Sequence, residues 1–305
     1  MKIVIMGSGG VGGYFGARLA DAGEDVSFVA RGRHLEAIKS RGLRVKSELG
    51  NTTIYPAVAS SSPEDLGMAD LILFCVKAYD TENAALAIKP LVGPDTGIIP
   101  FLNGIEHIQI LRKILGEKTV LGGVANISAL ITSPGVIEHF GTIQTLRVGE
   151  LDNKSSDRLA QFRIACEKAK IDVPVPDDIE TELWQKFVMI CTLAGVNCLT
   201  RLPLGECRKN PHSRKLMLSL AGEVITVARA YNINLPEEQI ELTMKLLDNL
   251  PIDMKASMLA ALERGDKLEA AALNGAVDRL GQTKGIDTPA NRIVYETLSP
   301  HENGS

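Results

Sequence analysis

The chain has 305 residues, of which 45% are hydrophobic and 23% are charged, so it is long enough for two globular domains and too apolar for a disordered protein. Its 33 basic and 37 acidic residues give a net charge of −4. This balance provides no strong positive field, so we expect no nucleic-acid partner.

Five cysteines stand at positions 75, 166, 191, 198 and 207, with no C-x-x-C pair among them. We therefore expect no metal site and interpret the cysteines as small buried residues in a reducing compartment. The N-terminal apolar run, Ile3–Met6, is four residues long, and the uncharged apolar segment of residues 187–200 is shorter than a membrane span. These features predict a cytoplasmic protein without a membrane partner.

Strand-like and helix-like segments alternate in the first half of the chain. Strands are predicted at residues 2–6, 25–30, 70–76, 97–102, 119–123, 136–140 and 146–149, and helices at 14–22, 34–40 and 81–91. The run DLILFCV at 70–76 shows no alternation of polar and apolar residues, which is typical of a strand covered by helices on both faces. The pattern predicts an α/β fold with a doubly wound parallel sheet.

The second half of the chain shows helical patterns only. Helices are predicted at residues 178–198, 211–231, 236–247, 253–264 and 266–284, and no convincing strand remains. We place the domain boundary after the segment DVPVP, at 172–176. The prediction is a sheet domain of residues 1–177 followed by an all-helical domain of residues 178–305, whose apolar faces could support a homodimer.

A glycine fingerprint follows the first predicted strand. It matches the pattern G-x-G-x-x-G and consists of Gly7, Ser8, Gly9, Gly10, Val11 and Gly12. Between a strand and a helix, the first glycine makes a tight turn, the second lets the backbone approach a pyrophosphate, and the third lets helix and strand pack closely. The helix N-terminus would offer unpaired N–H groups to the phosphates. This predicts a Rossmann-type domain that binds a dinucleotide.

The end of the second predicted strand indicates which cofactor is used. An NAD enzyme usually has an acidic residue there that accepts hydrogen bonds from the ribose 2′-hydroxyl, whereas this chain has Arg31 and Arg33. A guanidinium group suits a 2′-phosphate through charge-assisted hydrogen bonds. We therefore predict NADP(H), with Arg31 as the main contact and Arg33 as a second contact or a solvated loop charge.

Two candidates follow predicted parallel strands, where open α/β sheets bind ligands. Lys77 follows the run at 70–76, and Asn103 follows the run at 97–102. A lysine in this position is ordinarily a solvated charge, and Asn-Gly is ordinarily a turn, so the pattern alone leaves both readings open.

Lys186 borders a long apolar segment. The fourteen residues after it carry no charge, so the helix must be largely buried, and the ammonium group either reaches out to solvent or lines a cleft. In a cleft it could polarise a carbonyl and donate a proton, and partial burial would lower its pKa. Asn197 shares its helical face and could extend the polar site if Gly195 does not break the helix.

Four further polar residues precede or occupy the last predicted helix. Asp266 and Glu269 are spaced as in a capping box, which is one reading of Glu269; the other places its carboxylate in a cleft. Ser257 is by default an ordinary helix residue. Asn274 is a poor helix former and hints only weakly at a packing or ligand contact.

Together these motifs resemble the ketopantoate reductase family along nearly the whole chain. The matching segments are KIVIMGSGGVGGYFGARL at the N-terminus, Arg31, VKAYDT around Lys77, FLNGIE around Asn103, ELWQKF around Lys186, SML at 257–259, LEAAALNG around Glu269, and GIDTPAN at 285–291. The order and spacing of these segments make the resemblance specific.

The resemblance implies NADPH-dependent reduction of 2-dehydropantoate to pantoate in the pathway to pantothenate. It implies that Lys186 is the general acid and that Glu269 assists it. It also implies that Asn103 lies between cofactor and substrate, that Lys77 contacts the cofactor, and that Ser257 contacts the substrate carboxylate.

The chain departs from the family pattern at Ile190. Some members have an asparagine four residues after the catalytic lysine, where it contacts substrate. Asn197 matches a second family asparagine only with a gap of about three residues. An apolar residue at 190 removes a hydrogen-bonding group, which favours as the alternative a reductase of another branched or bulkier 2-oxo acid. The fold alone also permits a cofactor-binding protein without catalysis.

Overall fold

The computed structural model describes residues 1–304. These residues form two compact units. The first unit comprises Met1–Leu102 and His107–Ile179. The second comprises Asn103–Glu106 and the described chain from Glu180 onward. The boundary predicted at residue 177 left residues 103–106 in the sheet domain, whereas they lie with the helical unit.

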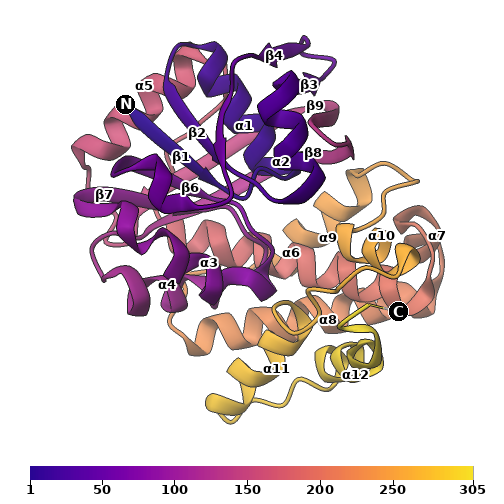
Figure 1. Cartoon of the computed structure of the whole chain (residues 1–305). Helices are drawn as coiled ribbons and strands as arrows, with labels where there is room; N and C mark the ends of the chain where they lie inside the picture. The colour runs from indigo at the N-terminus through magenta and orange to yellow at the C-terminus, as the bar shows by residue number, and fades with distance from the viewer. Residues whose placement is uncertain (305) are drawn as a thin grey trace. The chain divides into compact units, whose positions relative to one another are not determined.

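A five-stranded sheet forms the centre of the first unit (Figure 1). Its strands lie in the order β5, β2, β1, β6, β7, and every pairing between neighbours is parallel. The strands are β1 (Lys2–Met6), β2 (Asp25–Val29), β5 (Val58–Ser60), β6 (Ala69–Phe74) and β7 (Val92–Pro100). The Rossmann-type doubly wound sheet predicted from the apolar runs is confirmed. The strand order reverses between β1 and β6, which is where such sheets bind ligands.

A second sheet of four strands completes the first unit. Its order is β4 (Thr52–Ile54), β3 (Leu43–Lys46), β9 (Val136–Glu150) and β8 (Leu121–Ser133), and the last two strands form a long antiparallel hairpin. The prediction of separate strands at 136–140 and 146–149 is wrong. The intervening residues belong to β9, where they form a bulge opposite Ile127 and Ala129. The exposed Gly141 and Thr142 interrupt the apolar pattern in the sequence as a loop would.

Helices surround the sheets of the first unit. They are α1 (Gly10–Asp21), α2 (Gly32–Arg41), α3 (Thr81–Ile88), α4 (His107–Leu115) and α5 (Asp157–Lys168), of which α4 and α5 were not predicted. The helix α1 packs against strands of both sheets. The helices α3 and α4 pack against each other and lie below β6 and β7 in Figure 1.

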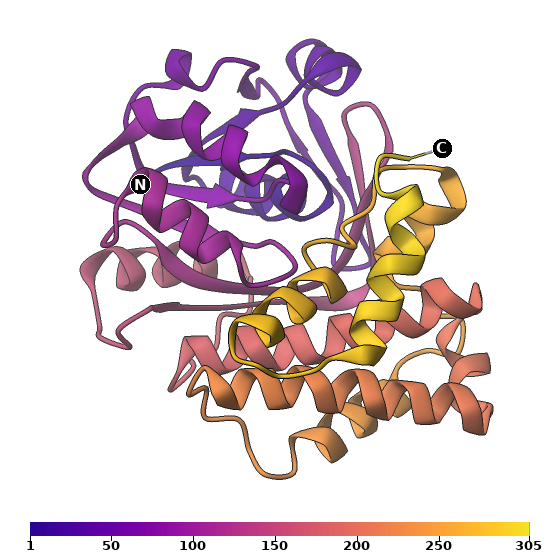
Figure 2. The ribbon, with the colours of Figure 1, turned by 90° about the horizontal axis from the view of Figure 1, so that it is seen from below.

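The second unit contains helices and no strand among its described residues. The helices are α6 (Ile179–Thr200), α7 (Leu204–Lys209), α8 (Pro211–Ala230), α9 (Gln239–Asn249), α10 (Ser257–Arg264), α11 (Asn274–Thr283) and α12 (Pro289–Leu298). The two longest, α6 and α8, run side by side (Figure 2) and meet where Leu220 packs against Gly195. The all-helical second part predicted from the sequence is confirmed, although α7 and α12 were missed.

The predicted helix over 266–284 is wrong in its first half. The helix α10 ends at Arg264, and its C-cap residue Gly265 adopts a left-handed conformation. The N–H of Asp266 donates a 2.9 Å hydrogen bond back to the carbonyl oxygen of Ala261. The Asp266 carboxylate pairs with Arg264, and no helix begins before Asn274. The capping box is therefore absent, and Glu269 lies in an irregular segment between α10 and α11.

The helix α6 runs unbroken through Gly195. By length and composition it could cross a membrane, but 72% of its apolar window is buried inside the protein, as in the core helix of a globular unit. The apolar segment of α6 is thus explained by the core of the second unit.

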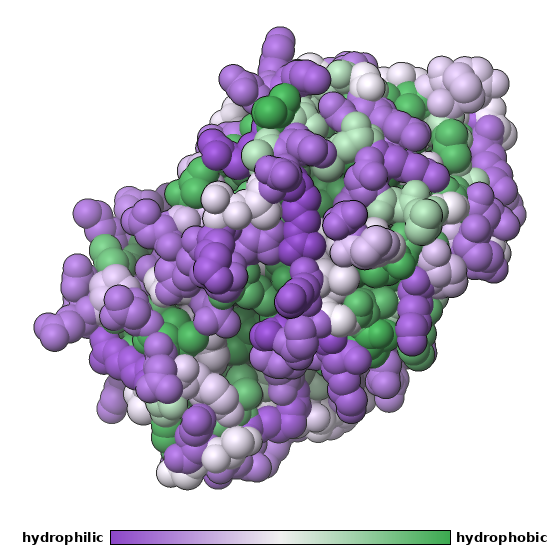
Figure 3. Space-filling view, turned by 90° about the vertical axis from the view of Figure 1, so that its left-hand side faces the viewer, coloured by the Kyte–Doolittle hydropathy of each residue, from purple (hydrophilic) through white to green (hydrophobic). Residues whose placement is uncertain are grey.

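On the face of the molecule in Figure 3, polar side chains predominate and apolar atoms appear in separate patches between them.

Candidate functional site

The glycine loop joins β1 to α1 at the point where the sheet order reverses. Gly7 has a φ of +95°, which favours glycine, and a Cβ there would lie 2.9 Å from the main-chain carbon of Cys75, just after β6. A Cβ at Gly12 would overlap the main-chain oxygen of Gly7. These two glycines therefore serve the tight turn and the close packing between loop, strand and helix.

Gly9 leaves open space where a ligand can approach. A Cβ at Gly9 would meet no atom within 4 Å, so packing does not explain this glycine. Gly9 is also the N-cap residue of α1, which has no side-chain cap and no acidic residue in its first turn. The N–H of Gly9 has no hydrogen-bond partner within residues 1–304. Unpaired N–H groups and the positive end of the helix fit a pyrophosphate group.

Gly10 has a packing role that the glycine fingerprint did not predict. A Cβ at this position would overlap the main-chain oxygen of Ala129 in β8. The start of α1 therefore lies directly against the second sheet. The fingerprint could not reveal this contact, because Ala129 is far away in the sequence and belongs to a different sheet.

Arg31 and Arg33 lie where β2 passes into α2. Arg31 is the N-cap residue of α2, in an extended conformation, and the first turn of this helix has no acidic residue. Both arginine side chains are exposed, and neither guanidinium group has a partner in the part of the chain that the structure describes. Two cations beside a helix N-terminus suit a phosphate group.

Lys77 follows β6 and is exposed. Lys77 is the N-cap residue of a short 3₁₀ helix at Ala78–Asp80 and follows Cys75 by two residues. Because Cys75 packs against Gly7, the main chain that leads to Lys77 passes beside the glycine loop. The predicted cofactor residues of the first unit, from Gly7 to Gly12 with Arg31 and Lys77, thus come from the C-terminal ends of β1, β2 and β6.

Asn103 is partly buried and belongs to the second unit. The next residue, Gly104, has a φ of +91°, and a Cβ on it would lie 2.7 Å from the main-chain oxygen of Ala272. Glu106 forms an ion pair of 2.6 Å with Arg279 of α11. These contacts explain why residues 103–106 group with the helices rather than with the sheet that precedes them.

Lys186 of α6 and Glu269 are electrostatically coupled within the second unit. Lys186 is partly buried, and Glu269 is only 7% exposed. Burial lowers the pKa of Lys186 to about 8, and the negative charge of Glu269 opposes this shift. A lysine amine whose pKa lies near neutrality can act as a general acid in water-excluded surroundings.

The segment that carries Glu269 is folded on itself and anchored at its far end. The carbonyl oxygen of Glu269 accepts hydrogen bonds from the N–H groups of Ala272 and Leu273, at 3.0 and 3.1 Å. Beyond this turn, Asn274 is fully buried, and its side-chain amide donates to Cys191 of α6. The sequence offered only its low helix propensity as a signal for this residue.

Asn274 belongs to a buried polar network across several helices. Its Nδ2 also donates to Oδ1 of Asn291 at 2.8 Å, at the start of α12. The Glu223 carboxylate of α8 accepts hydrogen bonds from Nδ2 of Asn291 and from the main-chain N–H groups of Ala290 and Asn291, at 2.8 to 2.9 Å. This network explains Asn291 of the GIDTPAN segment and Asn274 of the LNG segment by packing.

Asn197 supports the position of Ser257 from inside the core. Its side chain is fully buried, its Oδ1 accepts a 2.9 Å hydrogen bond from the N–H of Ala256, and its Nδ2 donates to the carbonyl oxygen of Leu202. Ala256 is the N-cap residue of α10, and the exposed Ser257 is its first residue. The expectation that Asn197 itself contacts a substrate gains no support from this position, since both ends of its amide are occupied.

Comparison with known proteins gives consistent matches. Residues 3–153 match the family model Ketopantoate reductase PanE/ApbA, and residues 178–302 match its C-terminal model. A 2-dehydropantoate 2-reductase of Archaeoglobus fulgidus is 33% identical over 99% of this chain and 98% of its own. An uncharacterized oxidoreductase of Bacillus subtilis, YkpB, is 30% identical over 99% of both chains. The crystal structure of a PanE/ApbA family ketopantoate reductase from Ralstonia eutropha has a TM-score of 0.91 and 31% identity, covering 99% of this chain and 98% of that one.

Proposed function

The chain belongs to the ketopantoate reductase PanE/ApbA family of oxidoreductases, and we propose that it catalyses the NADPH-dependent reduction of 2-dehydropantoate to pantoate, a step of pantothenate biosynthesis in the cytosol. The observation that carries this proposal is the coupled pair of Lys186 and Glu269, with a lysine pKa of about 8. This chain matches two relatives over nearly their full length: one is named 2-dehydropantoate 2-reductase, and the other is named a PanE/ApbA family ketopantoate reductase.

Lys186 acts as the general acid in the proposed reaction. Reduction of a ketone adds a hydride to the carbonyl carbon and a proton to its oxygen, and the bound nicotinamide supplies the hydride. The Lys186 ammonium polarises the carbonyl and gives its proton to the oxygen as the C–O bond becomes single. With a pKa of about 8, the ammonium form predominates at neutral pH and still loses its proton readily. The Glu269 carboxylate keeps this lysine charged until the oxygen takes the proton.

NADPH is the proposed cofactor. The open space at Gly9 and the uncapped start of α1 suit the pyrophosphate. The exposed Arg31, with Arg33 beside it, suits the 2′-phosphate that distinguishes NADPH from NADH. Lys77 and Asn103 are the further cofactor contacts that we propose.

Substrate recognition is the part of the proposal with an alternative. Ser257 is the proposed contact for the substrate carboxylate, and Asn103 and Lys186 are the proposed contacts near the ketone. Ile190, one turn after Lys186 in α6, offers no hydrogen bond. A site that lacks a polar contact discriminates weakly against substrates without the matching hydroxyl group. The alternative is therefore a reductase of another branched or bulkier 2-oxo acid.

The test is NADPH oxidation by the purified protein with 2-dehydropantoate, 2-oxoisovalerate and larger 2-oxo acids. We expect the highest kcat/KM with 2-dehydropantoate. A higher value with a simple or bulkier 2-oxo acid would support the alternative, and no turnover with any of them would contradict the enzyme assignment. The Lys186→Ala variant is the control, since loss of a general acid lowers kcat by about 100-fold or more.

A further inference from the structure

His34 of α2 connects two loops of the first unit. Its Nε2 lies 2.9 Å from the carbonyl oxygen of Ser8 in the glycine loop, and its Nδ1 accepts a 3.0 Å hydrogen bond from the N–H of Gly135. A carbonyl oxygen can only accept and a main-chain N–H can only donate. The ring must therefore be neutral, with its proton on Nε2. Burial lowers the pKa of His34, which favours this neutral form.

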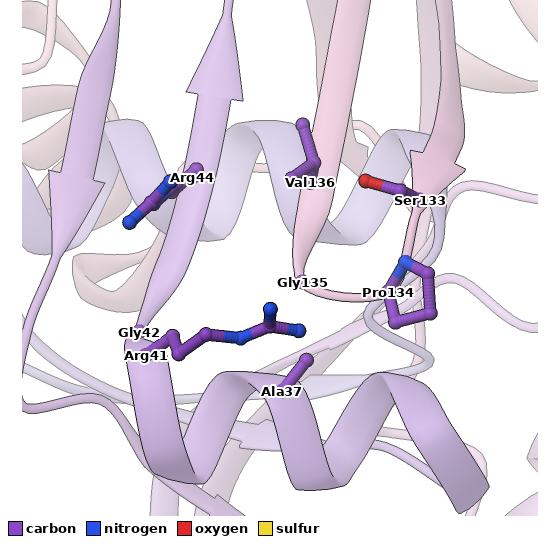
Figure 4. Close-up of a pocket in the computed structure, with 8 residues that line it drawn as sticks. All are labelled: Ala37, Arg41, Gly42, Arg44, Ser133, Pro134, Gly135 and Val136. Carbon is purple, nitrogen blue, oxygen red and sulfur yellow. The ribbon is translucent and has the colours of Figure 1, made fainter.

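Gly135 gives His34 a fixed support. It lies in the turn between β8 and β9, has a φ of +80°, and packs against Ala37 so closely that a Cβ would lie 2.9 Å from that methyl group. Its carbonyl oxygen accepts a 2.9 Å hydrogen bond from the N–H of Arg44 in β3. Figure 4 shows the turn over α2, where it forms one wall of a cavity of about 320 Å³. Gly135 is thus held at its N–H, its Cα and its carbonyl oxygen.

Ser8 is held on its other side by β2. Its N–H and its hydroxyl both donate to the carbonyl oxygen of Val29, at 3.2 and 3.1 Å, and the residue is only 3% exposed. The carbonyl group of Ser8 and the N–H of Gly9 belong to one planar trans peptide, so they point in opposite directions. When His34 fixes the Ser8 oxygen, it also fixes the direction of the Gly9 N–H.

We propose that His34 is a positioning residue for cofactor binding: it holds the Ser8–Gly9 peptide so that the unpartnered Gly9 N–H is presented to the pyrophosphate. This inference rests on the proposed function, because it requires a dinucleotide at the glycine loop. The tertiary structure supplies the support for the loop from β8 and β9, which lie outside the strand–loop–helix unit that contains the fingerprint.

Substitution of His34 by Gln or by Asn tests its two hydrogen bonds one at a time. In His34→Gln, the amide nitrogen can take the place of Nε2 and donate to Ser8. In His34→Asn, the amide oxygen can take the place of Nδ1 and accept from Gly135, and the bond to Ser8 is lost. His34→Ala loses both bonds. His212→Asn, at an exposed histidine of α8, is the matched control.

The experiment measures the Kd for NADPH by fluorescence titration and the Tm of each variant. We expect His34→Gln to bind nearly as the wild type, and His34→Asn and His34→Ala to bind about three- to tenfold more weakly, as loss of one hydrogen bond predicts. Equal affinities in all variants, or an equal loss in the Gln and Asn variants, would overturn the proposal. Failure of the wild type to bind any nicotinamide cofactor would instead contradict the proposed function.

The ligand-free protein provides a second readout. The amide NMR resonance of Gly9 should move in His34→Asn and His34→Ala and stay near its original position in His34→Gln. A Gly9 resonance that is unchanged in all three variants would overturn the positioning role, whether or not a cofactor binds.

Discussion

Asn274 donates a 3.2 Å hydrogen bond from its side chain to the main-chain oxygen of Cys191. Cys191 follows Lys186 by five residues, and Asn274 follows Glu269 by five residues. The bond is therefore roughly 7.5 Å along α6 from the lysine, at a rise of 1.5 Å per residue. Through this bond, Asn274 connects the segment that contains Glu269 to the helix that contains Lys186. It therefore helps to fix the distance between the two charged groups.

Gly195→Ala should lower stability by crowding this contact. A Cβ at Gly195 would lie 3.0 Å from Cδ1 of Leu220 and 3.2 Å from Nδ2 of Asn274. We expect a loss of about 1–3 kcal/mol in the free energy of unfolding, measured by denaturant titration. The control is Gly222→Ala in α8, where the nearest atom is 3.9 Å away and alanine should stabilise the helix by about 0.5–1 kcal/mol. Two variants of equal stability would contradict this role for Gly195.

The pH dependence of kcat should report the pKa of Lys186. The general acid must be protonated, so we expect the reduction rate to fall as pH rises through about 8, the pKa of Lys186. Glu269→Gln removes the charge that raises this pKa, so the fall should move to lower pH. The exposed Glu296→Gln in α12 should leave the profile unchanged. A fall only near the ordinary lysine pKa of about 10.4 would argue against a buried acid.

Alanine at Gly9 and at Gly10 should have different effects. At Gly9 the new methyl group meets no protein atom, so Tm should be retained while the affinity for NADPH falls, because the methyl group occupies the space proposed for the pyrophosphate. At Gly10 it would overlap the main chain at Ala129, so Tm should fall by several degrees. Thermal unfolding and cofactor titration of both variants check this. Full NADPH affinity in Gly9→Ala would contradict the assignment of the open space.

Arg31→Ala should change the choice of cofactor. Loss of a charge-assisted hydrogen bond to the 2′-phosphate should raise the KM for NADPH about tenfold or more and leave the KM for NADH nearly unchanged. Arg33→Ala should show a smaller effect in the same direction. Arg41→Ala, at the opposite end of α2, is the control. Equal changes for both cofactors would remove Arg31 from the 2′-phosphate site.

The sequence by itself determined the features that depend on near neighbours in the chain. Unbroken apolar runs predicted the parallel strands around β1 and β6, helical spacing predicted α6 and α8, and the glycine fingerprint predicted a turn between a strand and a helix. These patterns can be read locally because strand and helix periodicity and tight turns depend on residues a few positions apart.

Only the tertiary structure decided the rest. In the structure, α10 ends at Arg264, before the left-handed Gly265, so that Glu269 lies outside any helix, and residues 103–106 belong to the helical unit. The tertiary structure also brought Gly10 to Ala129, His34 to Gly135 and Asn274 to Cys191, which are pairs separated by many residues. Each of these outcomes depends on which distant segment packs alongside, and local periodicity does not encode that choice.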